Sequence, residues 1–310
     1  MTKQPLIIIS GPTASGKSAL GVRLAKDIGG EIVSADSMQV YKYMNIGTAK
    51  ITEAETEGIP HHMIDVCDPV NDYSVADYKE AAKKCVLDIL SRHKIPIVVG
   101  GTGFYIHALL YDTDFGIIES DGLIRQKIES DFNEYGPEVM HERLREKDPE
   151  AAEAIHMNDT KRVIRALEFY EIYGYKISEH NKEALSTESP YDFIYLALNR
   201  DREELYPLID RRVDKMISDG LQNEVRALKE YGCRRDNVSM QGIGYKELFD
   251  CSDIESAIEE IKLNSRHYAK RQFTWLRHEN DVTWINSPVS EEDYKWILRE
   301  CLKKRMKISE

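Results

Sequence analysis

The sequence predicts an α/β protein: a parallel sheet with helices on both faces, plus a helical insertion. Three observations predict this class. Short apolar runs alternate with helical periodicity over the first hundred residues, strand signals fade between about Gly116 and Pro190, and an apolar run returns at 193–199. Strands that alternate with helices form parallel sheets whose faces the helices cover.

The first strands and helices follow from these runs in order. "LIIIS" (6–10) is expected to be a buried strand, and the helical pattern after it ends at Gly29 and Gly30. "EIVSAD" (31–36) and "IPIVVGG" (95–101) are expected as further strands, with a helix at 75–93 between them. Ligands bind beyond the carboxyl ends of such strands. Three loops should therefore meet at one edge of the sheet: 11–18, the turn at Asp36, and "GGTG" at 100–103.

The middle of the chain is expected to be a helical insertion. Pro137 and Pro149 stand where the first turn of a helix tolerates proline. Asp159 can cap a helix that Gly174 ends. We therefore predict a core made of residues 1–115 and 190–310, interrupted by an insertion at 116–189.

The C-terminal part is expected to return to the sheet and then to be mostly helical. "FIYLALN" (193–199) is read as a strand that rejoins the sheet. Ser252 and Glu255 have the spacing of a capping box before a long helix at 256–277.

Composition indicates a globular protein that stays in the cytoplasm. Apolar residues make up 42% of the 310 and charged residues 31%. No apolar run approaches the roughly 18 residues of a membrane span, and the N-terminal run is too short for a signal peptide. The cysteines form no CxxC pair and are expected to be reduced thiols, and His61-His62 lacks a partner at metal-ligand spacing. The five cysteines are Cys67, Cys85, Cys233, Cys251 and Cys301.

The charge distribution is uneven. A net charge of −12 argues against a polyanionic partner. However, the segment 262–278 has five Lys or Arg and no acidic residue. It can be a solvated helix face or a surface that faces phosphates, and both interpretations stay open. A second basic cluster is mixed with acidic residues: Arg200, Arg202, Arg211, Arg212 and Lys215.

The clearest motif is "GPTASGKS" at 11–18, which fits the phosphate-binding pattern G-x-x-x-x-G-K-[ST] of a P-loop. Its glycines let backbone N–H groups turn toward an anion at the start of a helix. Lys17 would neutralise terminal phosphate oxygens, and Ser18 could bind Mg²⁺. The motif predicts a diphosphate or a triphosphate but does not identify ATP. Its residues are Gly11, Pro12, Thr13, Ala14, Ser15, Gly16, Lys17 and Ser18.

Two further loops limit the reactions that the protein is expected to catalyse. Asp36 is either an acid that binds substrate and accepts a proton from a nucleophile, or the first residue of an Asx-turn. The third predicted strand ends in Gly100, Gly101 and Thr102 and lacks the aspartate expected of an ATP hydrolase. This weakens an ATPase interpretation.

A family resemblance rests on eight ordered motifs, and it covers residues 5–278. With them the chain resembles the tRNA dimethylallyltransferases, also called tRNA isopentenyltransferases. It resembles the bacterial type, because it lacks the C-terminal zinc finger of some eukaryotic members. The motifs are "GPTASGKS", "SADSMQVYKYMNIGTAK", "PHHMID", "VGGTGFYIHALL", "NDTKRVIRALE", "DRRVDKMISDGL", "QGIGYKE" and "AKRQFTWLR".

The resemblance implies a reaction. Family members transfer a dimethylallyl group from its diphosphate to the exocyclic N6 of the adenosine just 3′ of the anticodon, in tRNAs that read codons beginning with U. The 11–18 loop would then hold a prenyl diphosphate, with Mg²⁺ at Ser18. The family's diphosphate arginine falls at Arg212, its proton-accepting carboxylate at Asp36, and Thr102 lies near a flipped adenosine.

The resemblance also implies where RNA binds. The insertion would contact the anticodon stem-loop, through a local basic groove because the whole chain is acidic, and the protein would be a monomer. The residues assigned to RNA binding are Asp36, Ser37, Met38, Gln39, Thr102, Arg125, Lys161, Arg162, Val163, Ile164, Arg165, Gln241, Gly242, Ile243, Gly244, Tyr245 and Lys246. Arg125 and Lys161 can equally be solvated helix charges.

Two other function classes compete with this one. A small-molecule or nucleoside kinase shares the phosphate loop and the parallel sheet, but the missing strand-end aspartate and the basic C-terminal helix speak against it. A non-catalytic tRNA-binding protein would have no use for an intact phosphate loop.

Overall fold

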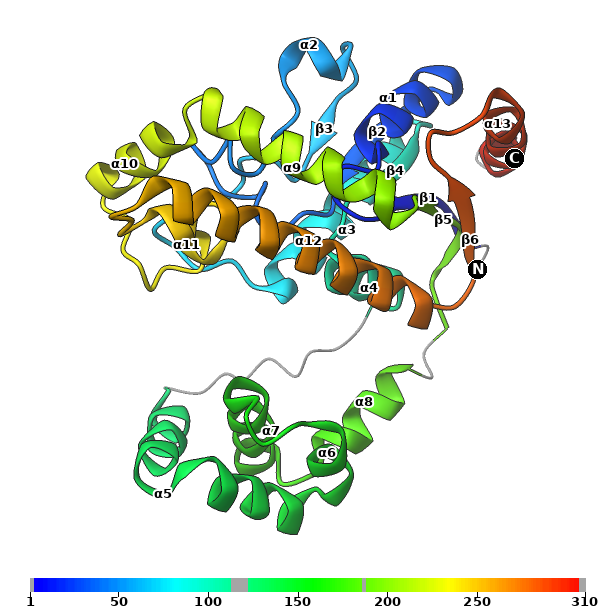
Figure 1. The fold of residues 1–310 in the computed structure, drawn as a ribbon. Helices are drawn as coiled ribbons and strands as arrows, with labels where there is room; N and C mark the ends of the chain where they lie inside the picture. Colours follow the sequence, from blue (N-terminus) through cyan, green and yellow to red (C-terminus); the bar gives the residue numbers. More distant parts are fainter. Residues whose placement is uncertain (1–2, 113–121, 186–187, 307–310) are drawn as a thin grey trace. The chain divides into compact units, whose positions relative to one another are not determined.

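The computed structural model describes residues 3–112, 122–185 and 188–306. The chain forms two compact units (Figure 1). Unit 1 combines Met1–Leu110 with Pro190–Glu310, and unit 2 is Tyr111–Ser189. Unit 1 contains the sheet, and the secondary structure described in unit 2 is helical.

Unit 1 is built on a 6-stranded sheet in the order β3-β2-β4-β1-β5-β6, and every pair of neighbouring strands is parallel. This confirms the predicted fold class. The strands are β1 (Gln4–Ser10), β2 (Gly30–Ser34), β3 (His61–His62), β4 (Ile95–Val99), β5 (Tyr191–Asn199) and β6 (Val282–Asn286).

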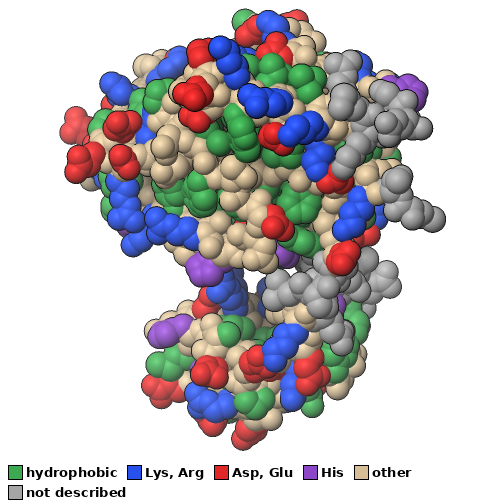
Figure 2. Space-filling model, turned by 90° about the vertical axis from the view of Figure 1, so that its right-hand side faces the viewer, with side chains coloured by type: hydrophobic (Ala, Val, Ile, Leu, Met, Phe, Trp, Pro, Cys, Tyr) green, Lys and Arg blue, Asp and Glu red, His purple; other side chains and the backbone are tan. Residues whose placement is uncertain are grey.

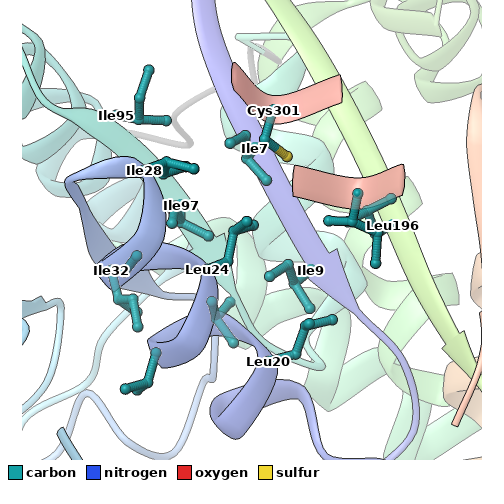
Figure 3. Close-up of a cluster of buried hydrophobic side chains, with 14 of the residues drawn as sticks. Ile7, Ile9, Leu20, Leu24, Ile28, Ile32, Ile95, Ile97, Leu196 and Cys301 are labelled. Carbon is teal, nitrogen blue, oxygen red and sulfur yellow. The ribbon is translucent and has the colours of Figure 1, made fainter. Parts of the chain in front are cut away.

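The sheet is central because its middle strands are apolar on both faces. Leu6, Ile7, Ile8 and Ile9 of β1 are all fully buried, as expected for a strand covered on both sides. Alternate side chains, Ile7 and Ile9 among them, pack against α1 (Lys17–Ile28) and α13 (Glu291–Met306) (Figure 3). α3 (Val75–Ser91) contacts β2 and β4, and the hydroxyl of its Tyr78 donates a hydrogen bond to the carbonyl of Ser34 at 3.1 Å.

The predicted strands exist, with different ends. The second strand stops at Ser34 and the third at Val99, so Asp36 and Gly101 lie in the loops beyond them. β3 and β6 were not predicted. β6 has one buried residue, Ile285, because it is an edge strand, and such a strand has no clear alternation of apolar and polar residues to detect.

The remaining helices belong partly to unit 1 and partly to unit 2. They are α2 (Glu53–Thr56), α4 (Gly103–Leu110), α5 (Leu123–Lys147), α6 (Pro149–Ala154), α7 (Thr160–Tyr173), α8 (Ile177–Leu185), α9 (Arg202–Ser218), α10 (Leu221–Tyr231), the 3₁₀ turn η1 (Ser239–Gln241), α11 (Tyr245–Leu248) and α12 (Ile254–His278). In unit 1, α9 and α12 run side by side (Figure 1).

The helix starts and ends predicted from single residues in unit 2 are confirmed. Gly136 has φ of 80° and interrupts α5, and Pro137 begins the second part of that helix. Pro149 opens α6. The side chain of Asp159 accepts a hydrogen bond from the N–H of Arg162 at 3.4 Å, and Gly174 ends α7 in a left-handed conformation. Unit 2 has its own apolar core: Ile128, Phe132, Met140, Leu144, Ala151, Ala152, Val163, Ile164, Ala166 and Leu167.

The capping box predicted for the C-terminal helix is wrong. α12 begins at Ile254, so Asp253 occupies the capping position instead of Ser252. Its carboxylate accepts hydrogen bonds from the N–H groups of Glu255 (3.1 Å) and Ser256 (3.4 Å). A carboxylate has the additional advantage of its negative charge at the N-terminal end of the helix dipole.

The adjacent histidines, His61 and His62, each contact a polar group of the protein. His62 Nε2 lies 2.8 Å from the buried carboxylate of Glu31, and His61 Nδ1 lies 2.8 Å from the carbonyl oxygen of Ile59. Glu31 also accepts hydrogen bonds from Arg92 and Lys94. Arg92 holds the pKa of Glu31 far below its usual range against the opposing effect of burial, and Lys94 and His62 lower the pKa further. In the described ranges, no group of three or more His, Cys, Asp and Glu is placed to hold a metal ion.

The surface is mixed in charge. Lys and Arg side chains are interspersed with Asp and Glu on the face drawn in Figure 2. Within the described parts of the chain, no helix has the length and apolar character needed to cross a membrane.

Candidate active site

A pocket of about 340 Å³ opens at the carboxyl edge of β1, β2 and β4, between their loops and the helices α9 and α12. This volume is in the range of small-molecule sites. All of the lining residues belong to unit 1. Those that the sequence singled out are Thr13, Lys17, Ser18, Asp36, Ser37, Met38, Gln39, Arg212, Gln241, Gly242, Ile243 and Lys246.

The phosphate loop forms one wall of this pocket. Gly16 precedes α1 with φ of 92°, a left-handed conformation that glycine adopts without strain. At Gly11 a Cβ atom would lie 2.9 Å from the carbonyl oxygen of Leu198, so only glycine allows this close approach to β5. Lys17 Nζ donates a hydrogen bond to the carbonyl of Pro12 at 2.7 Å, and Ser18 lines the pocket beside it.

Two of the cationic side chains that line the pocket, Lys17 and Arg212, interact electrostatically with its carboxylate, Asp36. Burial, together with the positive charge of Arg212, lowers the pKa of Lys17 to about 7 against the opposing effect of Asp36. Burial also lowers the pKa of Arg212, again against Asp36. The three charges are therefore close enough to influence one another. Arg212 donates a hydrogen bond to the carbonyl of Thr48 at 3.4 Å, whereas its neighbour Arg211 is exposed.

The Asx-turn that the sequence allowed for Asp36 is present. Its Oδ1 accepts hydrogen bonds from the N–H groups of Met38 (2.9 Å) and Gln39 (3.3 Å), which is an Asx-turn. Among the described residues, none donates a hydrogen bond to Oδ2. The turn therefore fixes one oxygen and leaves the other available to a ligand in the pocket.

Thr102 joins this turn to the loop after β4. Its Oγ1 accepts a hydrogen bond from the N–H of Ser37 at 3.0 Å and lies 3.4 Å from the Ser37 hydroxyl. Its own N–H donates to the carbonyl of Ala35 at 3.0 Å. Asp36 and Thr102, which are 66 positions apart in the chain, thus belong to two loops that hydrogen bonds join.

Gln39 and Met38 fix the 36–39 segment against its neighbours. Gln39 accepts a hydrogen bond from Ser34 and donates one to Thr48. Met38 lies against Gly242, where a Cβ atom would come within 2.9 Å of its sulfur. These contacts bring the 36–39 and 241–246 segments together.

The residues of 241–246 differ in accessibility. Gln241 is exposed, and Lys246 lines the pocket. Tyr245 is buried, and its hydroxyl donates to Glu224 at 2.6 Å. Gly244, with φ of 95°, precedes α11. The side chain of Tyr245 therefore has a structural role, and direct RNA contacts would come from its neighbours.

The sequence analysis missed one wall of the pocket, which is a face of α12. Tyr268, Arg271 and Gln272 line the pocket together with Ile261 and Ser265. Their helical spacing places them on one face. That spacing was visible in the sequence, and the motif "AKRQFTWLR" contains Arg271 and Gln272, but no role in the site was assigned to these residues.

Tyr268 interacts with two of the predicted catalytic residues, Asp36 and Thr102. Burial, together with the charge of Asp36, raises the pKa of its phenol to about 12 against the opposing effect of hydrogen bonds with Thr102 and Gln272. Tyr268 is therefore a neutral hydrogen-bonding group beside Asp36 and Thr102 at physiological pH.

The RNA-contact residues predicted in the insertion lie in unit 2. Lys161 and Arg162 are exposed, but Val163 and Ile164 are buried in the core of that unit. Arg165 is half-buried, and burial lowers its pKa. Val163 and Ile164 could touch RNA only through their backbone.

Arg125 is also in unit 2, where it is paired. It donates hydrogen bonds to Glu129 at 3.0 Å and to the buried Glu168 at 3.2 Å. A contact between Arg125 and a phosphate would therefore compete with two carboxylates.

The sequence model of the family described as "IPP transferase" matches residues 39–279 of the chain. Among curated proteins, the chain is 50% identical to a tRNA dimethylallyltransferase of Lachnoclostridium phytofermentans, with 97% of each chain covered. It is 46% identical to a tRNA dimethylallyltransferase of Bacillus velezensis, with 99% of each covered.

Solved structures agree in fold. A full-length tRNA isopentenylpyrophosphate transferase from Bacillus halodurans matches with a TM-score of 0.73 and 40% identity, covering 99% of this chain and 98% of that one. A eukaryotic dimethylallyltransferase acting on tRNA matches with a TM-score of 0.77 and 33% identity, covering 91% and 74%.

Proposed function

The chain belongs to the tRNA dimethylallyltransferase family, and we propose that the pocket at the carboxyl edge of its sheet brings the two substrates of that reaction together. The activity is the transfer of a dimethylallyl group from its diphosphate to the exocyclic N6 of an adenosine in tRNA, with release of diphosphate. The observation that carries the proposal is that Lys17, Arg212 and Asp36 share this pocket.

The diphosphate of the donor would lie on the phosphate loop. Lys17 and Arg212 both line the pocket and can carry positive charge, and the N-terminus of α1 adds backbone N–H groups. As the bond between the allylic carbon and the diphosphate oxygen breaks, negative charge moves onto the leaving group. Groups held ready for that charge stabilise the transition state.

The acceptor adenine would lie beside Asp36. An exocyclic amine is a weak nucleophile because its lone pair is delocalised into the ring. Oδ2 of Asp36 would accept a hydrogen bond from N6 and take its proton as the new C–N bond forms. The Asx-turn supports this role because it fixes the carboxylate through Oδ1. Thr102 would hold the loop, and with it the base, in place.

The pocket also suits Mg²⁺. The Ser18 hydroxyl and the Asp36 carboxylate provide hard oxygen ligands in the pocket that would hold the diphosphate, and Mg²⁺ in such sites commonly takes few protein ligands besides phosphate oxygens and water. We propose that Ser18 holds the ion. When bound, Mg²⁺ would offset part of the negative charge of the diphosphate.

The tRNA would present its anticodon loop to this pocket with the target base flipped out of its stack. Lys246 and the 36–39 turn would contact the loop from unit 1, and Lys161 and Arg162 would contact it from the insertion. The monomer implied by the family resemblance stays a prediction.

The function is tested by comparing donors. The pure protein is incubated with Mg²⁺ and an unmodified anticodon stem-loop, together with radiolabelled dimethylallyl diphosphate or with ATP. We expect label in the RNA from the prenyl donor and no consumption of ATP. Consumption of ATP without prenyl transfer would favour the kinase interpretation. Binding of RNA with neither reaction would favour a non-catalytic tRNA-binding protein.

We expect diphosphate binding to take up a proton above neutral pH. The pKa of Lys17 in the free protein is about 7, so at pH 8 most of the protein carries a neutral Lys17. A bound diphosphate raises this pKa, since opposite charge favours the protonated amine. The affinity for pyrophosphate should therefore fall as the pH rises above 7, by up to about tenfold per pH unit.

Calorimetry at pH 8, in two buffers with different ionisation enthalpies, measures this uptake directly. The Lys17→Met variant is the control that removes the titrating group. Equal proton uptake by the wild type and by Lys17→Met would contradict the assignment of the low pKa to Lys17.

We also expect Arg271 to contribute one phosphate contact to RNA binding. It lines the pocket, and among the described residues it has no acidic partner within salt-bridge distance. Arg271→Gln should reduce the slope of log K against log salt by about 1. Arg266, on the same helix, is the matched control, because it is paired with Asp210 at 2.6 Å. A slope that changes equally in Arg266→Gln, or in neither variant, would contradict this contact.

A further inference from the structure

Gln272 connects the two loops that the proposed function assigns to the two substrates. Its side chain is 6% exposed, on the face of α12 that lines the pocket. Its Oε1 accepts a hydrogen bond from the N–H of Thr13 at 2.9 Å, and its Nε2 donates one to the carbonyl of Gly101 at 2.9 Å. Thr13 belongs to the phosphate loop, and Gly101 directly precedes Thr102.

The gap between these loops is fitted to this side chain. A Cβ atom at position 101 would lie 2.1 Å from Nε2 of Gln272, so only glycine leaves room for the carboxamide. The strands below are already joined, since the Ser10 hydroxyl donates to the carbonyl of Gly100 at 2.9 Å. Gln272 makes the connection one step farther out, where the loops leave the sheet and form the pocket.

The chemistry of the connection requires an amide. Thr13 offers a donor and Gly101 an acceptor, and a carboxamide supplies the complementary acceptor and donor on one rigid group. An ionised carboxylate could accept from Thr13 but could not donate to Gly101. A methionine of similar length could do neither.

The connection bears on the reaction because transfer needs a short distance between donor and acceptor. The allylic carbon would be held through its diphosphate by the phosphate loop, and N6 through the Asp36 and Thr102 loops. Reacting atoms must approach to roughly 3–3.5 Å, and a misplacement of about 1 Å can cost on the order of 100-fold in rate. A group that fixes the spacing of these loops therefore influences the rate without touching either reacting atom.

We propose that Gln272 is a positioning residue that sets the distance between the prenyl donor and the acceptor amine. This inference rests on the proposed function and goes beyond it. When the spacing is relaxed, the activated donor becomes open to water. Its carbon–oxygen bond to diphosphate then breaks, a carbon–oxygen bond to water forms, and dimethylallyl alcohol, diphosphate and a proton are released.

The test compares Gln272→Met and Gln272→Glu with the wild type and with Gln222→Met, an exposed glutamine on α10 that serves as the matched control. Two quantities are measured in the same reaction with dimethylallyl diphosphate and an anticodon stem-loop: diphosphate released and prenyl group transferred to RNA. The melting temperature and the KM of each substrate are measured in parallel.

We expect Gln272→Met to lower kcat by about 100-fold, to change the KM of each substrate by less than about threefold, and to release clearly more diphosphate than the prenyl group it transfers. Gln272→Glu should show the same uncoupling with a raised KM for the diphosphate donor, because a negative charge then lies next to the phosphate loop. Gln222→Met should behave as the wild type.

A purely structural role has a different signature. It would lower the melting temperature or the fraction of active protein and leave the ratio of diphosphate released to prenyl transferred at one. That outcome, or a wild-type kcat in Gln272→Met, would overturn the inference. A wild-type protein that transfers no prenyl group would instead overturn the proposed function, so the two failures are distinguishable.

Discussion

Asp36→Asn should lower the rate of prenyl transfer by about 10²–10⁴-fold, the range expected when a general base is removed. Asparagine keeps an oxygen that can accept the hydrogen bonds from Met38 and Gln39, so the turn should survive. It cannot take the proton from N6. Single-turnover transfer to an anticodon stem-loop measures the effect on chemistry.

The same variant should still bind RNA. We expect its dissociation constant for the stem-loop to stay within about threefold of wild type, because the shape of the turn is retained. Asp72→Asn, an exposed aspartate, is the control for removal of one negative charge. Undiminished transfer by Asp36→Asn would remove Asp36 from the role of proton acceptor and leave it with the Asx-turn alone.

Lys17→Met should lower kcat/KM for dimethylallyl diphosphate by about 10²–10³-fold, as is typical when one group that stabilises developing negative charge is removed. Methionine retains much of the length of the side chain but carries no charge. Steady-state kinetics with varied prenyl donor give the value.

Two comparisons make this result specific. Lys295→Met removes an exposed lysine on α13 and should leave kcat/KM unchanged. The KM for the stem-loop should be the same in Lys17→Met as in the wild type, since Lys17 would face the diphosphate. Unchanged kinetics with the prenyl donor would discredit the assignment of the 11–18 loop to the diphosphate.

Much of the sheet could be predicted because its central strands are short runs of apolar residues. Four consecutive apolar residues at 6–9 and a phosphate-loop pattern after them specify a buried strand, a turn and a helix. β6 could not be predicted in this way, since an edge strand with one buried residue has almost no pattern. Its place in the sheet depends on pairing with β5, which is a tertiary contact.

The candidate site was predictable where it lies on loops and not where it lies on a helix. Loops at strand ends have glycines and charged residues that stand out from apolar surroundings, as at 11–18 and 100–103. The residues of α12 that line the pocket have the spacing of any helix face, so their spacing does not mark a site. Only the packing of α12 against α9 decides which of its faces turns toward the pocket. Gln272 lies in the motif "AKRQFTWLR", but its role could not be predicted, because both of its partners are distant in the chain.

The basic segment 262–278 shows how packing separates alternatives that composition leaves open. Lys262 and Arg266 form ion pairs with Asp214 and Asp210 of α9 at 2.8 and 2.6 Å, so they connect helices. Arg271 faces the pocket. The segment is therefore neither wholly a solvated face nor wholly a phosphate-facing surface.

The central claim is that one pocket joins a prenyl diphosphate to the exocyclic amine of a flipped adenosine. The most direct measurement is single-turnover transfer of label from dimethylallyl diphosphate to two stem-loops that differ at one base. One carries adenosine 3′ of the anticodon, and the other carries purine riboside, which lacks the exocyclic amine, at that position. The account predicts label in the first RNA and none in the second, with both RNAs bound. Equal labelling of the two RNAs, or binding without labelling of either, would contradict it.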